Sequence, residues 1–160
     1  MKEIDMNLAF GFSIRRVGDK DMFKFPSFPE IVVAVDKDEM SEADIIARAE
    51  RLVKHALQVR LDYNRDIPSG DCSKAKDIEY CVRMSPLVTT KVLLYLECRK
   101  NGWSKAQIAR HLDVTPTTAA RILDLFHESR TEVLAYAASR MGKALDATIS
   151  LVPAVEHAEK

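Results

Sequence analysis

Apolar and polar residues alternate along the first part of the chain, as they do in half-buried β-strands. The alternation is clearest in residues 8–17, and the turn sequence Gly-Asp-Lys-Asp that follows it predicts a hairpin. Two more apolar runs come next, one rich in phenylalanine and interrupted by prolines, the other β-branched. Because proline cannot donate to a sheet ladder, the first of these runs is expected to break near Pro26. The pattern therefore predicts three strands, at residues 8–17, 22–28 and 31–35.

From Ser41 onward, apolar residues recur every three or four positions, which is the spacing of one helix face. Ser41 and Asp44 have the spacing of a capping box, so a helix of about five turns is expected to begin there. A polar connection rich in turn residues follows at 64–77, and we expect it to be flexible. Residues 78–84 alternate again and predict a fourth strand. The first 84 residues are therefore expected to form a small β-β-β-α-β module.

The most distinctive pattern is SKAQIARHLDVTPTTAARIL, residues 104–123, which predicts two short helices joined by a tight turn. Ser104 and Gln107 have capping-box spacing, and Thr115 followed by Pro116 is a typical start for the second helix. Small residues stand where the two helices would cross. This is the helix-turn-helix pattern, in which the second helix enters the major groove of DNA.

Further elements are expected on either side of this pattern. One helix begins at the Ser-Pro pair at 85–86 and ends at Gly102, and another runs roughly over residues 131–141. Residues 144–152 alternate enough to predict a closing strand. The last residues, 153–160, are expected to form a loose tail.

Length and composition fit an α+β protein with two domains. A chain of 160 residues can hold two small domains, and 47% hydrophobic residues are enough for a buried core. No apolar run has the length of a membrane span, and the first residues lack the features of a signal peptide. We expect a module at 1–84, an all-α helix-turn-helix domain with the closing strand at 85–152, and the tail at 153–160.

The cysteines and histidines predict no metal or cofactor site. Cys72, Cys81 and Cys98 are odd in number and lack the spacing of metal ligands, so we interpret them as free thiols. Free thiols are typical of a cytoplasmic protein. The four histidines are scattered along the chain and predict no metal centre.

The net charge of zero conceals an uneven distribution. Residues 1–82 hold 13 Lys and Arg against 16 Asp and Glu, whereas residues 83–145 hold 10 against 5. Positive charge is thus concentrated around the helix-turn-helix pattern, where contact with phosphates requires it. Ordinary scatter is the alternative explanation, and the charge favours DNA binding only together with the motif.

Three stretches of the sequence resemble the HicB antitoxins of bacterial and phage toxin–antitoxin pairs. They are FKFPSFPEIVVA at 23–34, SEADIIARAERLVKHALQVRLDYNRDIPSG at 41–70, and the block from MSPLVTTKVLLYLECRKNGW to RMGKAL at 84–145. The last is the most specific. Two positions depart from the family's usual pattern: Asp113 stands where relatives usually have Gly, and Pro116 where many have a long polar side chain.

The resemblance implies a division of functions between the two domains. The family's N-terminal module has a partial RNase H-like fold and covers the partner toxin HicA, a small ribonuclease that cleaves mRNA. The C-terminal domain dimerises and binds the promoter of its own operon. We therefore expect an antitoxin and autorepressor, with a HicA-type toxin and double-stranded operator DNA as partners, assembled as a homodimer or tetramer.

Eight residues in or beside the two helices of the motif are candidates for contact with DNA. Those in the first turn of the first helix, among them Lys105, are expected to meet phosphates. On the second helix Thr117 should face the groove, and Arg121 can reach a guanine or a phosphate. A salt bridge from Arg121 to Asp124 or Glu128 is the alternative. The candidates are Ser104, Lys105, Gln107, Thr115, Pro116, Thr117, Ala120 and Arg121.

The acidic residues after the third predicted strand could suggest an enzyme or a binding surface. RNase H-type catalysis needs carboxylates that converge from separate strands to hold two metal ions. Here the acids are bunched in one loop, so no catalytic residue and no enzymatic activity are expected. Asp36, Asp38 and Glu39 can instead meet a basic toxin surface, although a solvated loop explains them as well.

Two other functions are compatible with the sequence. One is a stand-alone prophage or plasmid repressor, in which the N-terminal module senses something else or only oligomerises. The other is a toxin-binding protein with little DNA specificity, which Pro116 makes conceivable because it replaces a base-reading side chain. The recognition helix is poor in polar side chains under either reading, so DNA shape is expected to contribute to its recognition.

Overall fold

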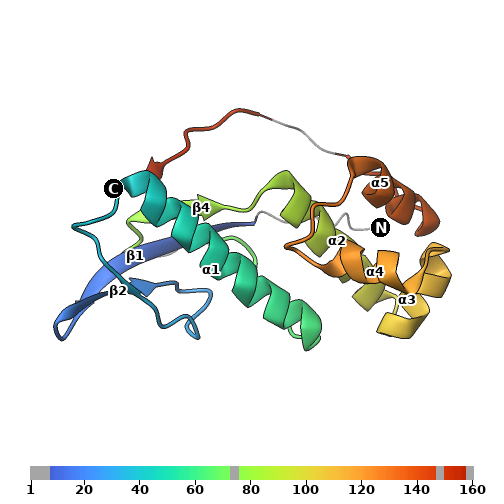
Figure 1. Ribbon diagram of the computed structural model, residues 1–160, viewed down its shortest axis with the longest axis horizontal. Coiled ribbons are helices and arrows are strands. Elements are labelled where there is room, and N and C mark those ends of the chain that lie inside the picture. Colours follow the sequence, from blue (N-terminus) through green and yellow to red (C-terminus); the bar gives the residue numbers. More distant parts are fainter. Residues whose placement is uncertain (1–7, 73–75, 147–149, 158–160) are drawn as a thin grey trace. The chain divides into compact units, whose positions relative to one another are not determined.

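The structure, a computed structural model, describes residues 8–72, 76–146 and 150–157. Its elements are β1 (Ala9–Val17), β2 (Lys20–Lys24), β3 (Ala34–Val35), α1 (Glu42–Asp62), β4 (Tyr80–Arg83), α2 (Pro86–Lys100), α3 (Lys105–Leu112), α4 (Pro116–Leu123), α5 (Thr131–Arg140) and β5 (Glu156–His157). Antiparallel strands with one long helix are followed by four helices, which confirms the α+β class (Figure 1).

The chain forms two compact units, each of which is described by itself. We call the first the sheet unit; its described residues are 8–60, 66–72, 76–84 and 151–157. We call the second the helical unit; its described residues are 61–65, 85–146 and 150.

The sheet has the strand order β3-β2-β1-β4-β5, and every neighbouring pair is antiparallel. The second half of β1 pairs with β2 across the predicted hairpin, where Gly18 has a φ of 65° that L-residues rarely adopt. The first half of β1 pairs with β4. As the alternation predicts, Phe10, Phe12 and Ile14 are buried.

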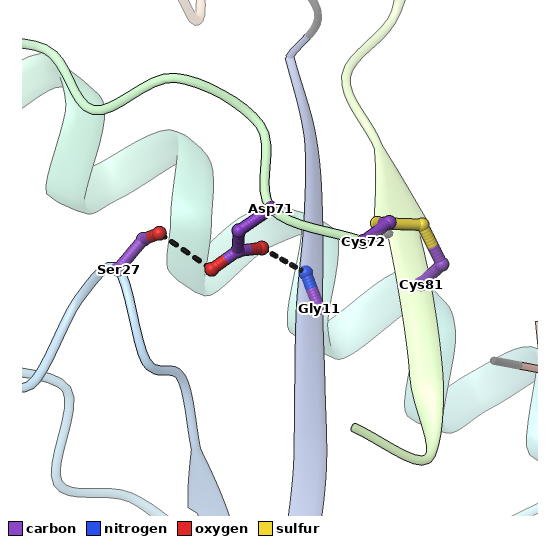
Figure 2. Close-up of a disulfide and its surroundings, with 5 residues drawn as sticks. All are labelled: Gly11, Ser27, Asp71, Cys72 and Cys81. Carbon is purple, nitrogen blue, oxygen red and sulfur yellow. Dashed lines mark hydrogen bonds between the residues drawn. A yellow bond between two sulfur atoms is a disulfide. The ribbon is translucent and has the colours of Figure 1, made fainter. Parts of the chain in front are cut away.

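Helix α1 supplies the apolar stripe that covers one face of this sheet. It begins at the predicted capping box, in which the Asp44 N–H donates to Ser41 Oγ at 3.2 Å and the Ser41 N–H donates to the Asp44 carboxylate at 3.3 Å. Ile45, Ala49 and Val53 are buried at helical spacing. In Figure 2, α1 runs behind β1 and β4.

Part of the 64–77 connection is hydrogen-bonded to the edge of β1 that β2 leaves open. The Asp71 carboxylate accepts hydrogen bonds from the Gly11 N–H at 2.7 Å and from Ser27 Oγ at 2.6 Å (Figure 2). The Asp71 N–H donates to the Ala9 carbonyl at 3.1 Å. The first half of β1 is therefore bonded on both edges, by β4 and by Asp71.

The prediction of three free thiols is wrong for two of the cysteines. Cys72 and Cys81 form a disulfide with their Cα atoms 5.7 Å apart, and Cys98 is free and buried. Cys81 stands opposite Gly11 in the β1–β4 register, and the chain after Asp71 brings Cys72 beside it (Figure 2). This proximity arises from long-range strand pairing, which cysteine number and spacing do not reveal.

Several predicted strands have other bounds in the structure. β2 is Lys20–Lys24 rather than 22–28 and ends before Pro26, and β4 is Tyr80–Arg83 rather than 78–84. β3 contains only Ala34–Val35 of the predicted 31–35. In the predicted closing strand 144–152, residues 147–149 lie outside the described residues and the others are irregular. The closing strand is instead β5, inside the predicted loose tail, and it pairs with β4 in the sheet unit. An otherwise open edge of β4 explains why the pairing is made there.

Helices α2 to α5 of the helical unit pack around one apolar core (Figure 1). α2 starts at Ser85, whose Oγ accepts from the Val88 N–H at 3.2 Å, and Gly102 ends it with a φ of 70°. Both features are as predicted. The core consists of Leu94, Cys98, Ile108, Ala109, Leu112, Ala119, Ile122, Leu134, Ala137 and Ala138.

Candidate nucleic-acid interface

Helix α3 begins with the capping box that its sequence predicts. The Gln107 N–H donates to Ser104 Oγ at 3.4 Å, and the Ser104 N–H donates to Gln107 Oε1 at 2.9 Å. These bonds satisfy donors that have no carbonyl partner at the start of a helix. Since Gln107 Oε1 is used in the cap, the amide nitrogen of Gln107 is the group left to donate to a phosphate.

The turn between α3 and α4 depends on Asp113, which adopts the left-handed conformation with φ 53° and ψ 49°. Its N–H donates back to carbonyls in the last turn of α3. Helix α4 then starts at Thr115, whose Oγ1 accepts from the Thr118 N–H at 3.2 Å, with Pro116 in the first turn. The cap at Ser104 fixes where α3 begins, and the cap at Thr115 fixes where α4 begins.

The two helices bury one face and expose the other. On α4, Ala119 and Ile122 are buried, whereas Thr117, Ala120 and Arg121 are exposed at the spacing i, i+3 and i+4. All eight residues predicted to contact DNA are exposed: Ser104, Lys105, Gln107, Thr115, Pro116, Thr117, Ala120 and Arg121. The arrangement thus offers a solvent-facing helix with a packed back, as insertion into a groove requires.

Arg121 is the cation that this face of α4 presents. Within the part of the chain that the structure describes, its guanidinium forms no salt bridge with Asp124 or Glu128, the alternative raised by the sequence. The Asp124 carboxylate instead accepts a hydrogen bond from the Phe126 N–H at 2.9 Å. The Arg121 side chain is therefore exposed and available for a phosphate or a base edge.

Lys91 of α2 is a residue of this unit that the sequence reading missed. It is fully buried at 0% exposure, and its Nζ donates to the carbonyls of Arg121, Asp124 and His127 at 2.9, 2.6 and 2.6 Å. Burial lowers the pKa of its ammonium group, and the negative charge of Asp124 opposes that shift. The signal available in the sequence is its place on the apolar stripe of α2, one turn after Val88.

The acidic residues proposed to meet a toxin lie in the sheet unit. Asp36, Asp38 and Glu39 are all exposed. Asp36 and Asp38 line a surface hollow of about 400 Å³ together with Arg16 and Arg48 among others. The hollow therefore carries charges of both signs, so complementarity to a basic partner rests on individual carboxylates rather than on a uniformly acidic patch.

The described residues contain no group of three or more His, Cys, Asp and Glu arranged to hold a metal ion. None of the helices in those residues combines the length and apolar character that crossing a membrane demands. The disulfide and the buried Cys98 account for all three cysteines. Burial, together with the charge of Glu97, raises the pKa of the Cys98 thiol to about 11, which keeps it neutral and unreactive near pH 7.

Comparison with known proteins agrees with the helix-turn-helix geometry. A family model described as "Homeodomain-like domain" matches residues 91–135, which include α3, the turn and α4. Antitoxin HicB from Pseudomonas fluorescens (strain Pf0-1) is 32% identical over 88 residues, 55% of this chain and 60% of that protein. Antitoxin HicB 2 from Photorhabdus laumondii subsp. laumondii is 27% identical over 122 residues, 76% of this chain and 82% of that protein.

The chain is similar to two proteins named Antitoxin HicB. The resemblance drawn from the sequence alone is thereby confirmed. The match with the Pseudomonas HicB protein spans less than two thirds of that protein's length.

Proposed function

We propose that this chain is an antitoxin with two separate binding functions. The sheet unit neutralises a HicA-type ribonuclease that cleaves mRNA, and the helical unit represses the chain's own operon by binding operator DNA. The observation that carries the proposal is the exposed face of α4, with the exposed side chain of Arg121, in a chain similar to proteins named Antitoxin HicB. The chain acts by binding alone and without catalysis. The Cys72–Cys81 disulfide removes the free-thiol argument for a cytoplasmic location, which now rests on the proposed partners, operator DNA and a ribonuclease that cleaves mRNA.

DNA recognition follows from the geometry of α3 and α4. With α4 in the major groove, Thr117, Ala120 and Arg121 face the base edges, and Arg121 can bind a guanine through O6 and N7. Lys105 and the N-terminus of α3 bind the phosphate backbone. Since Arg121 is the long polar side chain on this face, DNA shape supplies part of the specificity. A homodimer binds two half-sites about 34–36 Å apart, or a multiple of that distance.

Toxin binding is assigned to the exposed acids after β3. Asp36, Asp38 and Glu39 attract the basic surface expected of a ribonuclease that binds RNA. Charges at the rim of an interface act mainly on the association rate. The Asp36→Asn and Asp38→Asn pair is therefore expected to slow complex formation several-fold, most strongly at low salt.

Titration of a duplex from upstream of the gene, followed by fluorescence anisotropy, tests the DNA-binding part. Arg121→Ala is expected to weaken binding to this duplex by about 1–3 kcal/mol and to leave an unrelated duplex nearly unaffected. Lys105→Ala is expected to weaken binding to both duplexes and to reduce the salt slope by about one. Lys20→Ala removes an exposed cation from the sheet unit and serves as the matched control.

Affinity that neither Arg121→Ala nor Lys105→Ala changes would contradict the site assignment. Binding to the upstream duplex without any complex with a toxin would instead favour the stand-alone repressor. A toxin complex without discrimination between the two duplexes would favour a toxin-binding protein with little DNA specificity.

A further inference from the structure

Lys91 lies at the junction of α2 with the end of α4, inside the helical unit. All three N–H bonds of its ammonium group have a partner, since Nζ donates to the carbonyls of Arg121, Asp124 and His127. The side chain is 0% exposed. The three carbonyls belong to the last turn of α4 and to the residues that follow it. The Lys91 side chain therefore joins three points of the segment by which the chain leaves α4, and it adds to the turn bonds within that segment.

The chemistry of this contact is unusual for a helix core. Burial of an ammonium group lowers the free energy of unfolding unless the group is fully hydrogen-bonded. An apolar side chain of similar size can often replace buried charges without loss of stability. Here the charge meets the negative end of the α4 dipole and adds to two backbone turn bonds, from the Asp124 N–H to the Arg121 carbonyl at 3.3 Å and from the His127 N–H to the Asp124 carbonyl at 3.2 Å. The hydrogen bonds thus offset the free-energy cost of burying the charge, and they restrict residues 121–127 to one geometry.

Arg121 connects this buried contact to the exposed face. Its carbonyl oxygen accepts hydrogen bonds from Lys91 Nζ at 2.9 Å, from the Asp124 N–H at 3.3 Å and from Ser129 Oγ at 3.5 Å. Its side chain is exposed on the other side of α4. The same residue is therefore held by its backbone and exposes its guanidinium to solvent. A shift of the α4 end would move the guanidinium with it.

We propose that Lys91 is a positioning residue for DNA recognition: it holds the C-terminal end of α4 so that Arg121 meets the base edges in one orientation. The inference rests on the proposed binding of operator DNA by α4. Lys91 itself contacts no DNA, because it is buried behind the helix. Its removal affects sequence discrimination, whereas contacts with phosphates made from α3 remain.

The test uses the full-length chain with the substitution Lys91→Met, which retains the length of the side chain and removes its donors. Affinity is measured by anisotropy for the duplex from upstream of the gene and for an unrelated duplex of equal length, at several salt concentrations. Lys100→Met, an exposed lysine on the same helix, is the control. Circular dichroism reports the folded fraction of each variant.

We expect the ratio of the two affinities to fall about tenfold in Lys91→Met, with an unchanged salt slope, and to stay constant in Lys100→Met. The ratio separates positioning from stability, since a loss of folded protein lowers both affinities by the same factor. Lys91→Gln, which retains a short amide donor, gives a smaller fall and replaces Lys91→Met should that variant fold poorly.

An unchanged ratio in Lys91→Met or Lys91→Gln, beside clear discrimination by the unsubstituted chain, would overturn the positioning role and leave the proposed repressor function intact. Absence of discrimination by the unsubstituted chain would overturn the repressor function itself, and the role of Lys91 with it.

Discussion

Gly11 is a position in β1 at which the packing of the sheet unit leaves no room for a side chain. A Cβ atom at this position would overlap with the side chain of Ile78, with atoms at 2.7 and 2.9 Å among its neighbours. Beside it, the Gly11 N–H donates to Asp71, and the opposite residue Cys81 is bonded to Cys72. The absence of a side chain lets the connection pass close to β1.

Gly11→Ala is therefore expected to lower the free energy of unfolding by about 1–3 kcal/mol, the usual cost of overpacking a core. Urea denaturation measures the change. In an Ile78→Ala background the same substitution should cost much less, because the overlapping side chain is gone. Equal costs in the two backgrounds would contradict the close approach of Ile78 to Gly11.

At the scale of elements, the turn between α3 and α4 has Asp113 at a position whose backbone conformation favours glycine. Asp113 has a φ of 53°, a conformation that costs L-residues about 1–2 kcal/mol relative to Gly. Its carboxylate also adds negative charge beside the face proposed to bind DNA. The strain opposes formation of the turn, and the negative charge opposes DNA binding by the neighbouring face.

Substitution of Asp113 should separate these two effects. Asp113→Gly is expected to raise the free energy of unfolding by up to about 1 kcal/mol and to strengthen binding to any duplex. Asp113→Ala removes the same charge but retains the strain, so it should strengthen DNA binding without the gain in stability. Thermal unfolding and anisotropy report the two quantities. A gain in stability from Ala as large as that from Gly would be inconsistent with backbone strain.

The disulfide joins the connection after α1 to strand β4. The loop that it closes has a sequence separation of 9 residues, for which chain entropy predicts about 2.6 kcal/mol of stabilisation. Treatment with a dithiol, or the substitution pair Cys72→Ser and Cys81→Ser, should lower the stability of the sheet unit by that amount. Hydrogen exchange should then quicken at Gly11 and Asp71 and remain constant in α3 and α4. Uniform quickening across both units would argue against this local effect.

The elements that local patterns specify were predictable, and those set by long-range pairing were not. The Ser41 and Ser104 capping boxes, the turn at Gly18 and the α4 start at Thr115 each depend on a few neighbouring residues. By contrast, β5 forms where β4 offers an open edge, and no local alternation marks that position.

The residues of the candidate site also separate into those set by local patterns and those set by long-range contacts. Exposure of the candidates inside α3 and α4 follows from helical periodicity, and Ser104 and Thr115 are set by their capping patterns, so the sequence could place them. The role of Lys91 depends on carbonyls thirty and more residues further along the chain, which only the fold brings to it. The Cys72–Cys81 bond likewise depends on the register of β1 with β4.

At the scale of the whole molecule, the uneven distribution of charge along the sequence follows the division into two units. Residues 1–82, which supply most of the sheet unit, hold more acids than bases, and residues 83–145, which supply most of the helical unit, hold twice as many bases as acids. An acidic sheet unit suits a basic ribonuclease, and a basic helical unit suits DNA. The distribution supports two partners of opposite charge for one chain.

Cleavage of a labelled RNA by the proposed HicA-type partner toxin tests the central claim most directly. The proposed function predicts that cleavage stops once the full-length chain reaches one equivalent of the toxin, with or without operator DNA. The Arg121→Ala variant should inhibit equally well, because its substitution lies on the DNA-binding face. Cleavage that continues undiminished at a large excess of the folded chain would contradict the assignment of this protein as an antitoxin.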